Sequence, residues 1–308
     1  MKSQITLFLK GVAMGAADVV PGVSGGTIAF ITGIYETLIN SIKSVNATAL
    51  KLLFSFQLKA FWEYINGTFL LILFAGIATS VLSLAKLITY LLEHHPIPIW
   101  SCFFGLIIIS AILVGKQIRK WSVPVLLTGI AGIAIAYFVT VATPTSTPEN
   151  YGFIFLSGAI AICAMILPGI SGSFLLLILG KYAFILNAIK NLQLDVIAVF
   201  GAGCVLGLAL FSRFISWLLS KYHDLAVALL SGFMIGSLNK VWPWKEVLST
   251  RINSHGEEVA LITKNILPST YGQHANPQTL VAIICIVGAI ALVFGLDYFA
   301  SRSNTKQA

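Results

Sequence analysis

The pattern of apolar and polar positions divides the chain into long apolar runs separated by short polar segments. Five runs carry at most one charged residue each, and most are close to the roughly 20 residues that cross a bilayer core. They lie at 69–92, 99–114, 123–142, 196–219 and 280–300. Charged residues make up only 10% of the 308 residues, against about 25% in a soluble domain. The pattern predicts an all-α polytopic membrane protein.

Two further apolar runs contain closely similar sequences, PGVSGG and PGISGS. Aligning Pro21 with Pro168 gives ten identities in the 23 positions that begin there, and a shorter offset continues the match through the later apolar runs. The chain is therefore a duplicated unit. We expect repeat 1 to cover residues 1–143 and repeat 2 to cover residues 144–308, joined in one integrated domain.

Each repeat begins with an apolar run that the Pro-Gly pair breaks into two limbs. A limb of about 16 residues is roughly 24 Å long as a helix, which is shorter than a bilayer core of roughly 30 Å. A re-entrant helical hairpin is therefore predicted at about 5–42 and again at about 152–190. Three predicted transmembrane helices follow each hairpin, so each repeat crosses the membrane an odd number of times. The two repeats are then expected to have inverted topology.

Two segments lie outside this scheme. Residues of about 44–66 are absent from repeat 2, and their Lys51 and Lys59 interrupt aromatic and leucine positions, which is typical of an interfacial amphipathic helix. The polar loop 239–276 carries no motif.

With the N-terminus inside, eleven basic residues lie in cytoplasmic segments and six outside, so the positive-inside rule predicts cytoplasmic N- and C-termini.

The charged and metal-binding residue types exclude several functions. The net charge of +8 comes from scattered Lys and Arg residues, so no nucleic-acid partner is expected. The four cysteines lie in apolar runs without CxxC spacing, which indicates small buried side chains rather than a metal site or disulfides. We therefore expect no metal and no cofactor.

The broken helices are the candidate chemistry. Pro21 and Pro168 each remove a backbone donor and end one helix, and the next helix then begins with unpaired N–H groups at its positive end. Such a terminus suits an anion, especially phosphate. A tolerated kink is the alternative, but duplication of the whole motif favours a functional site. The candidate phosphate-binding residues of the two hairpins are Gly22, Ser24, Gly25, Gly26, Thr27, Gly169, Ser171, Gly172 and Ser173.

Charged residues within the apolar runs add to this site. Lys86 and Arg213 occupy matched positions of the two repeats, where each either neutralises a bound anion or extends to the interface. Arginine suits phosphate because its fork binds two oxygens. Asp18 and Glu36 have no acidic counterpart in repeat 2. Each is a candidate for proton coupling or for support of the site, while Asp18 could equally cap the break and Glu36 could mark a hairpin end.

The sequences "GAADVVPGVSGGTIAFITGIYE" and "MILPGISGSFLLLILGKY" together resemble the bacterial polyprenyl-phosphate (undecaprenyl phosphate) transporter family, PopT, formerly a domain of unknown function. The resemblance covers nearly the whole chain. It implies that the two Pro-Gly segments form hairpin tips. It also implies return of undecaprenyl phosphate from the outer to the inner leaflet of the bacterial cytoplasmic membrane, which recycles the carrier for cell-envelope biogenesis.

Two other functions compete with this interpretation. Helix N-termini with Gly, Ser and Pro could also pass a small inorganic anion, so an anion channel or small-anion transporter is the alternative. A lipid phosphatase is the enzyme alternative, but the five histidines lie in loops or at span ends, away from the repeated motif. We therefore expect a transporter rather than an enzyme, with a polyprenyl phosphate and the lipid bilayer as its partners.

Overall fold

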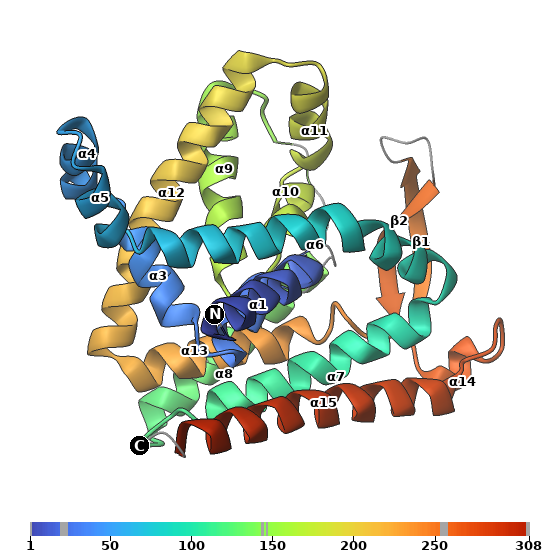
Figure 1. Cartoon of the computed structure of the whole chain (residues 1–308). Coiled ribbons are helices and arrows are strands. Elements are labelled where there is room, and N and C mark those ends of the chain that lie inside the picture. Colours follow the sequence, from blue (N-terminus) through green and yellow to red (C-terminus); the bar gives the residue numbers. More distant parts are fainter. Residues whose placement is uncertain (1, 19–23, 143–144, 146, 253–257, 306–308) are drawn as a thin grey trace.

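The computed structural model describes residues 2–18, 24–142, 145, 147–252 and 258–305 (Figure 1). Within these ranges, the side chains of residues 2, 85, 86, 89, 251–252, 258–262 and 296–305 lie outside the description. The described chain is mostly helical and includes one pair of strands. This agrees with the predicted helical membrane protein, apart from the strands.

Each predicted hairpin forms three helices rather than two limbs. In repeat 1 they are α1 (Lys2–Asp18), α2 (Gly25–Ile31) and α3 (Tyr35–Lys43), and in repeat 2 they are α9 (Tyr151–Ile166), α10 (Gly172–Ile178) and α11 (Tyr182–Lys190). The first limbs have the predicted length of about 16 residues. The second limbs break at Gly33 (φ +71°) and Gly180 (φ +66°), because glycine adopts the left-handed conformation that ends a helix. The α10–α11 break bends the chain by 106°.

Six longer helices follow the hairpins. They are α6 (Gly67–His94), α7 (Pro96–Gly115), α8 (Val123–Val141), α12 (Leu194–Lys221), α13 (His223–Ser237) and α15 (Thr279–Thr305). By length and composition, four of them could cross a membrane: α6, α7, α8 and α12. Helix α13 has 15 residues and the searched apolar part of α15 has 17 (Thr279–Gly295), so both are shorter than the roughly 20 residues that cross a bilayer core.

Small residues set how these helices pack. Gly11 lets α1 lie directly against the backbone of α6 at Leu73, and Gly158 lets α9 lie against the backbone of α12 at Phe200. The last helix of each repeat then packs on the other repeat. Helix α8 lies along α13, and α15 lies along α7 (Figure 1). Close backbone approach at glycine is typical of helix pairs in membranes.

The segment predicted as one interfacial helix is two short helices, α4 (Ala47–Phe54) and α5 (Leu58–Tyr64). Phe56 has a φ of 55°, which ends α4 and turns the chain. Phe54 and Phe56 are 77% and 87% exposed. The single helix was therefore wrong, although the apolar surface that motivated an interfacial position is present.

The polar loop 239–276 contains regular structure that the sequence reasoning missed. Strands β1 (Lys245–Ile252) and β2 (Glu258–Asn265) pair antiparallel, and α14 (Pro268–Tyr271) follows them. Trp244 is buried with Ile97 of α7 and Ala282 of α15, and its indole N–H donates to the Pro277 carbonyl at 2.8 Å. This cluster fixes the strand pair at one side of the molecule, opposite α4 and α5 (Figure 1).

Candidate functional site

The segments that follow the two hairpin breaks meet in the interior. Ser24 Oγ donates to the Met165 carbonyl at 3.2 Å, and the Gly169 amide donates to Thr27 Oγ1 at 3.1 Å. Ser24 is 1% exposed and Thr27 is fully buried. The repeated motifs, 147 residues apart in sequence, are therefore in direct contact.

In repeat 1, protein groups already occupy the start of α2. The Gly25 amide donates to Asp18 Oδ1 at 2.6 Å, and the Gly26 amide donates to Ser24 Oγ at 3.1 Å. The carboxylate of Asp18 thus lies where a bound anion would lie, at the positive end of the helix. An anion can bond the Gly25 amide only if Asp18 moves away, and the Gly26 amide only if Ser24 Oγ does.

In repeat 2, the start of α10 is built differently. Ser171 makes no capping hydrogen bond to the helix, and its Oγ lies 2.9 Å from Ser173 Oγ. Gly169 has a φ of +84°, and a Cβ at this position would lie 2.9 Å from the Phe233 carbonyl oxygen. This glycine is therefore required by both its conformation and its close contact with α13.

The other predicted site residues are more dispersed. Arg213 Nη1 donates to the Ala209 carbonyl at 2.5 Å, and no described contact joins Arg213 to either tip. Glu36 is exposed and lines a small cavity of about 130 Å³ with Asn40 and Ser216. Pro21, Gly22 and the Lys86 side chain lie outside the described residues. Pro168 lies in the second tip, between α9 and α10.

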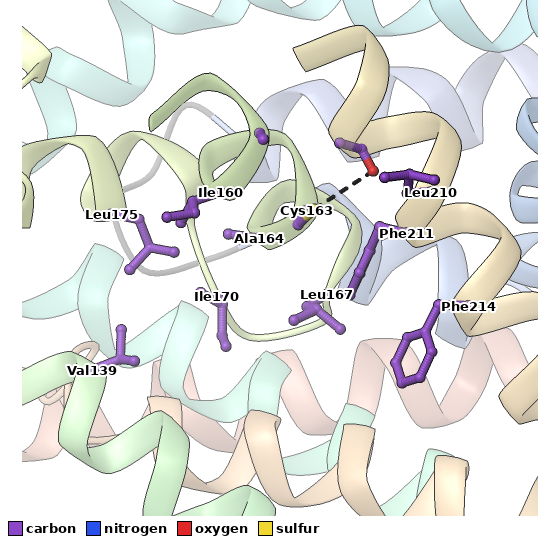
Figure 2. A pocket seen from close by; sticks show the side chains of 12 residues that line it. Val139, Ile160, Cys163, Ala164, Leu167, Ile170, Leu175, Leu210, Phe211 and Phe214 are labelled. Carbon is purple, nitrogen blue, oxygen red and sulfur yellow. Dashed lines mark hydrogen bonds between the residues drawn. The ribbon is translucent and has the colours of Figure 1, made fainter. Parts of the chain in front are cut away.

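An apolar groove of about 510 Å³ opens beside the second tip. Helices α9, α10 and α12 supply most of its lining, with Val139 from α8 (Figure 2). Leu167 and Ile170 line it from the two sides of Pro168–Gly169, so the groove extends to the tip itself. Cys163 also lines it and donates to the Gly207 carbonyl at 3.7 Å (Figure 2). The groove suits a flexible apolar chain.

A polar contact joins helices of the two repeats. Lys43 Nζ donates to Ser216 Oγ at 3.0 Å, and Ser216 Oγ donates to Asn40 Oδ1 at 3.0 Å, so α3 is held on α12. Asn187 and Lys190 of α11 occupy the matched positions of repeat 2. In the described part of the chain, α11 does not pack against α6 to a comparable extent.

Two lysines that sequence reasoning passed over also lie in the interior. Lys240 and Lys245 flank the sequence "VWPW" in the polar loop and together line two cavities at the side of the molecule that carries β1 and β2. The sequence signal that could have identified this site is a lysine on each side of two closely spaced tryptophans. The loop assignment hid it, because a polar loop is normally solvated and its lysines exposed.

Comparison with known proteins was made for the whole chain. Residues 14–259 match the family described as undecaprenyl phosphate translocase-like. A polyprenyl-phosphate transporter of Vibrio cholerae is 51% identical over 300 residues, with 97% of each chain covered. A polyprenyl-phosphate transporter of Staphylococcus aureus is 36% identical over 253 residues, which cover 76% of this chain and 85% of that protein. No solved structure gives a significant match.

Proposed function

The chain belongs to the undecaprenyl phosphate translocase-like family, and on this premise we propose that it carries undecaprenyl phosphate across the bacterial cytoplasmic membrane. The direction we propose is from the outer to the inner leaflet, which returns the carrier lipid for envelope synthesis. The family and both relatives are named for transport rather than for catalysis.

One observation carries the proposal: an apolar groove reaches a polar tip that contains the buried Ser171 and the exposed Ser173. Leu167 and Ile170 line the groove, and Ser171 and Ser173 follow immediately at the start of α10. A ligand with a phosphate head and a prenyl tail has these two halves. A small inorganic anion has no apolar part that would lie in the groove, so a lipid phosphate is favoured over a small anion as the substrate.

The head group is proposed to bind at the tips, with both helix starts as donors. In repeat 2 the donors would be Ser171, Ser173 and the first amides of α10. In repeat 1 the phosphate would replace the Asp18 carboxylate at the Gly25 amide and Ser24 Oγ at the Gly26 amide, and protonation of Asp18 would favour the exchange. Glu36 would support the site from α3. Arg213, and with it Lys86, would have to turn toward the tips as the phosphate arrives.

We propose that the two repeats have inverted topology and that one repeat moves against the other during transport. Each repeat, 1–143 and 144–308, supplies one hairpin and three spans, and the mutual exchange of α8 and α15 supports a two-fold relation between them. The α3–α12 contact, without a comparable α11–α6 contact, supports a state closed on one side only. Opening the first contact and forming the second would expose the tips to the other leaflet.

The proposed orientation places both termini, α4 and α5 in the cytoplasm or at its membrane surface. Strands β1 and β2 then face the outside. The opposite positions of these two elements in the structure support this arrangement (Figure 1).

The test is movement of undecaprenyl phosphate in liposomes that contain the purified protein, beside empty liposomes. Transport by the wild type that Arg213→Ala abolishes, in a protein that still folds, would support both the substrate and the head-group site. Chloride or phosphate conductance without lipid movement would favour the channel and overturn the proposal.

A further inference from the structure

The side of the molecule that carries β1 and β2 contains a second polar site, which borders α10 of the second hairpin. Two cavities of about 370 and 390 Å³ are lined in common by Lys240, Lys245 and Thr263. We call them together the lysine cavity. Lys240 lies three residues after the end of α13 at Ser237, and Lys245 begins β1, so both residues lie in the connection between this helix and the strand pair.

Aromatic rings hold the two ammonium groups. Lys240 Nζ lies 4.1 Å from the centre of the Phe174 ring of α10, and Lys245 Nζ lies 3.8 Å from the centre of the Trp100 ring of α7. Lys245 Nζ also donates to the Lys240 carbonyl at 2.7 Å. Cation–π contacts orient a lysine while leaving most of its N–H donors available to another partner.

The pair has no counter-charge among the described residues. No described carboxylate lies within 4.0 Å of either ammonium, and within the same part of the chain Lys240 Nζ has no hydrogen-bond acceptor. Both lysines are partly buried, and burial lowers the pKa of each. Two partly buried cations side by side are costly unless an anion compensates them.

The other polar side chains beside the lysines bond mainly to one another. Asn265 Nδ2 donates to both the carbonyl and the Oδ1 of Asn239, and Asn239 Nδ2 donates to Thr140 Oγ1. These bonds fix a polar rim around the lysines. Lys264 adds a further basic side chain from β2.

The lysine cavity adjoins the apolar groove. Helix α8 supplies Val139 to the groove and Thr140 to the cavity, while α10 supplies Leu175 to the groove and Phe174 to the cavity. Consecutive residues of two helices thus face the two spaces. A phosphate monoester with an apolar chain can therefore span both.

We propose that Lys240 and Lys245 form a docking site for the phosphate of a polyprenyl phosphate, which binds here before its head group passes along α10 to the hairpin tips. This inference rests on the proposed function for its ligand, whereas the anion site itself rests on the geometry alone. The strand pair and its tryptophans then serve to hold the two lysines over α7 and α10.

The site should respond to pH. In the absence of an anion, burial and the charge of Lys240 lower the pKa of Lys245 to about 7. The other titratable groups that line the cavity are Lys240, Lys264, Tyr137 and Tyr271. A bound phosphate favours the charged lysine, so affinity should fall as pH rises above 7, by up to about tenfold per pH unit for one proton. Arginine stays charged in this range, so Lys245→Arg should flatten the dependence.

The experiment measures binding to the full chain in detergent, with farnesyl phosphate, farnesol and inorganic phosphate as probes. Lys240→Gln/Lys245→Gln is compared with Lys51→Gln/Lys59→Gln, which removes two exposed lysines of α4 and α5 and changes the net charge equally. We expect the first double variant to weaken farnesyl phosphate binding about 10- to 100-fold, and the second to leave it unchanged. Lys240→Arg/Lys245→Arg retains the charge and guards against a folding defect.

Each outcome decides a different point. Farnesyl phosphate binding that is equal in wild type and Lys240→Gln/Lys245→Gln overturns the docking site, even if lipid transport is intact. Equally tight binding of inorganic phosphate identifies free phosphate as the ligand and overturns the lipid assignment. Loss of binding in this variant supports the site even if liposomes show no lipid movement, a result that would refute the proposed function alone.

Discussion

The contact between the hairpin tips can be tested by Thr27→Val. Valine has nearly the shape of threonine, so packing at this fully buried position is kept while the Oγ1 acceptor is lost. The Gly169 amide, which donates to that oxygen at 3.1 Å, is left unpaired in the interior. A buried donor without a partner costs about 1–3 kcal/mol.

That cost converts to a measurable shift in thermal unfolding. A loss of 1 kcal/mol lowers Tm by about 2–4 °C in domains of 150–250 residues, so a loss of about 1–3 kcal/mol in Thr27→Val should lower Tm by about 2–12 °C in detergent. The shift should lie toward the low end because this chain is longer. Lipid transport should fall as well, since one of the two described hydrogen bonds that join the repeats at the tips would be lost.

Two control variants separate the hydrogen bond from other effects. Thr27→Ser keeps the acceptor and removes one methyl group, which costs about 0.8 kcal/mol. Thr128→Val removes a hydroxyl that donates only to the Pro124 carbonyl of its own helix, and it should leave Tm unchanged. A Thr27→Val protein that unfolds at the wild-type temperature would refute the view that this bond joins the tips.

Three further predictions concern the same machinery. Gly169→Ala should lower the free energy of unfolding by about 1–2 kcal/mol or more, because alanine resists a φ of +84° and its Cβ would press on a carbonyl. Gly201→Ala is the control, because a Cβ there meets no atom within 4 Å. Equal Tm values for the two variants would contradict the argument. Asp18→Asn should weaken the pH dependence of transport, because the amide cannot titrate at the start of α2, and a wild-type pH profile would exclude Asp18 as the coupling group. Asn40→Cys/Ser216→Cys, made in a protein whose native cysteines are serine, should cross-link α3 to α12 on oxidation and stop transport until it is reduced; undiminished transport by the cross-linked protein would rule out opening at this contact.

The hairpins show how far sequence reasoning reached. Helix α1 ends at Asp18 and α2 begins at Gly25, while α9 ends at Ile166 and α10 begins at Gly172, as expected because Pro removes a helix hydrogen bond and its ring clashes with the preceding turn. Gly33 and Gly180 were matched in the repeat, yet their effect on the second limbs was missed. A glycine in an apolar run can stay helical, and only the surrounding packing decides whether it adopts a positive φ.

The sequence alone determined that this is a duplicated, multi-pass membrane protein with a chemically unusual break in each copy, because hydropathy and Pro-Gly chemistry act locally. Tertiary structure decided what those breaks contact: Asp18 at the start of α2, Thr27 against Gly169, and Arg213 bonded within its own helix. It also folded a loop without a motif into strands that hold Lys240 and Lys245 inside. Such contacts join residues far apart in the chain, so their partners follow from how the helices pack and not from any single segment.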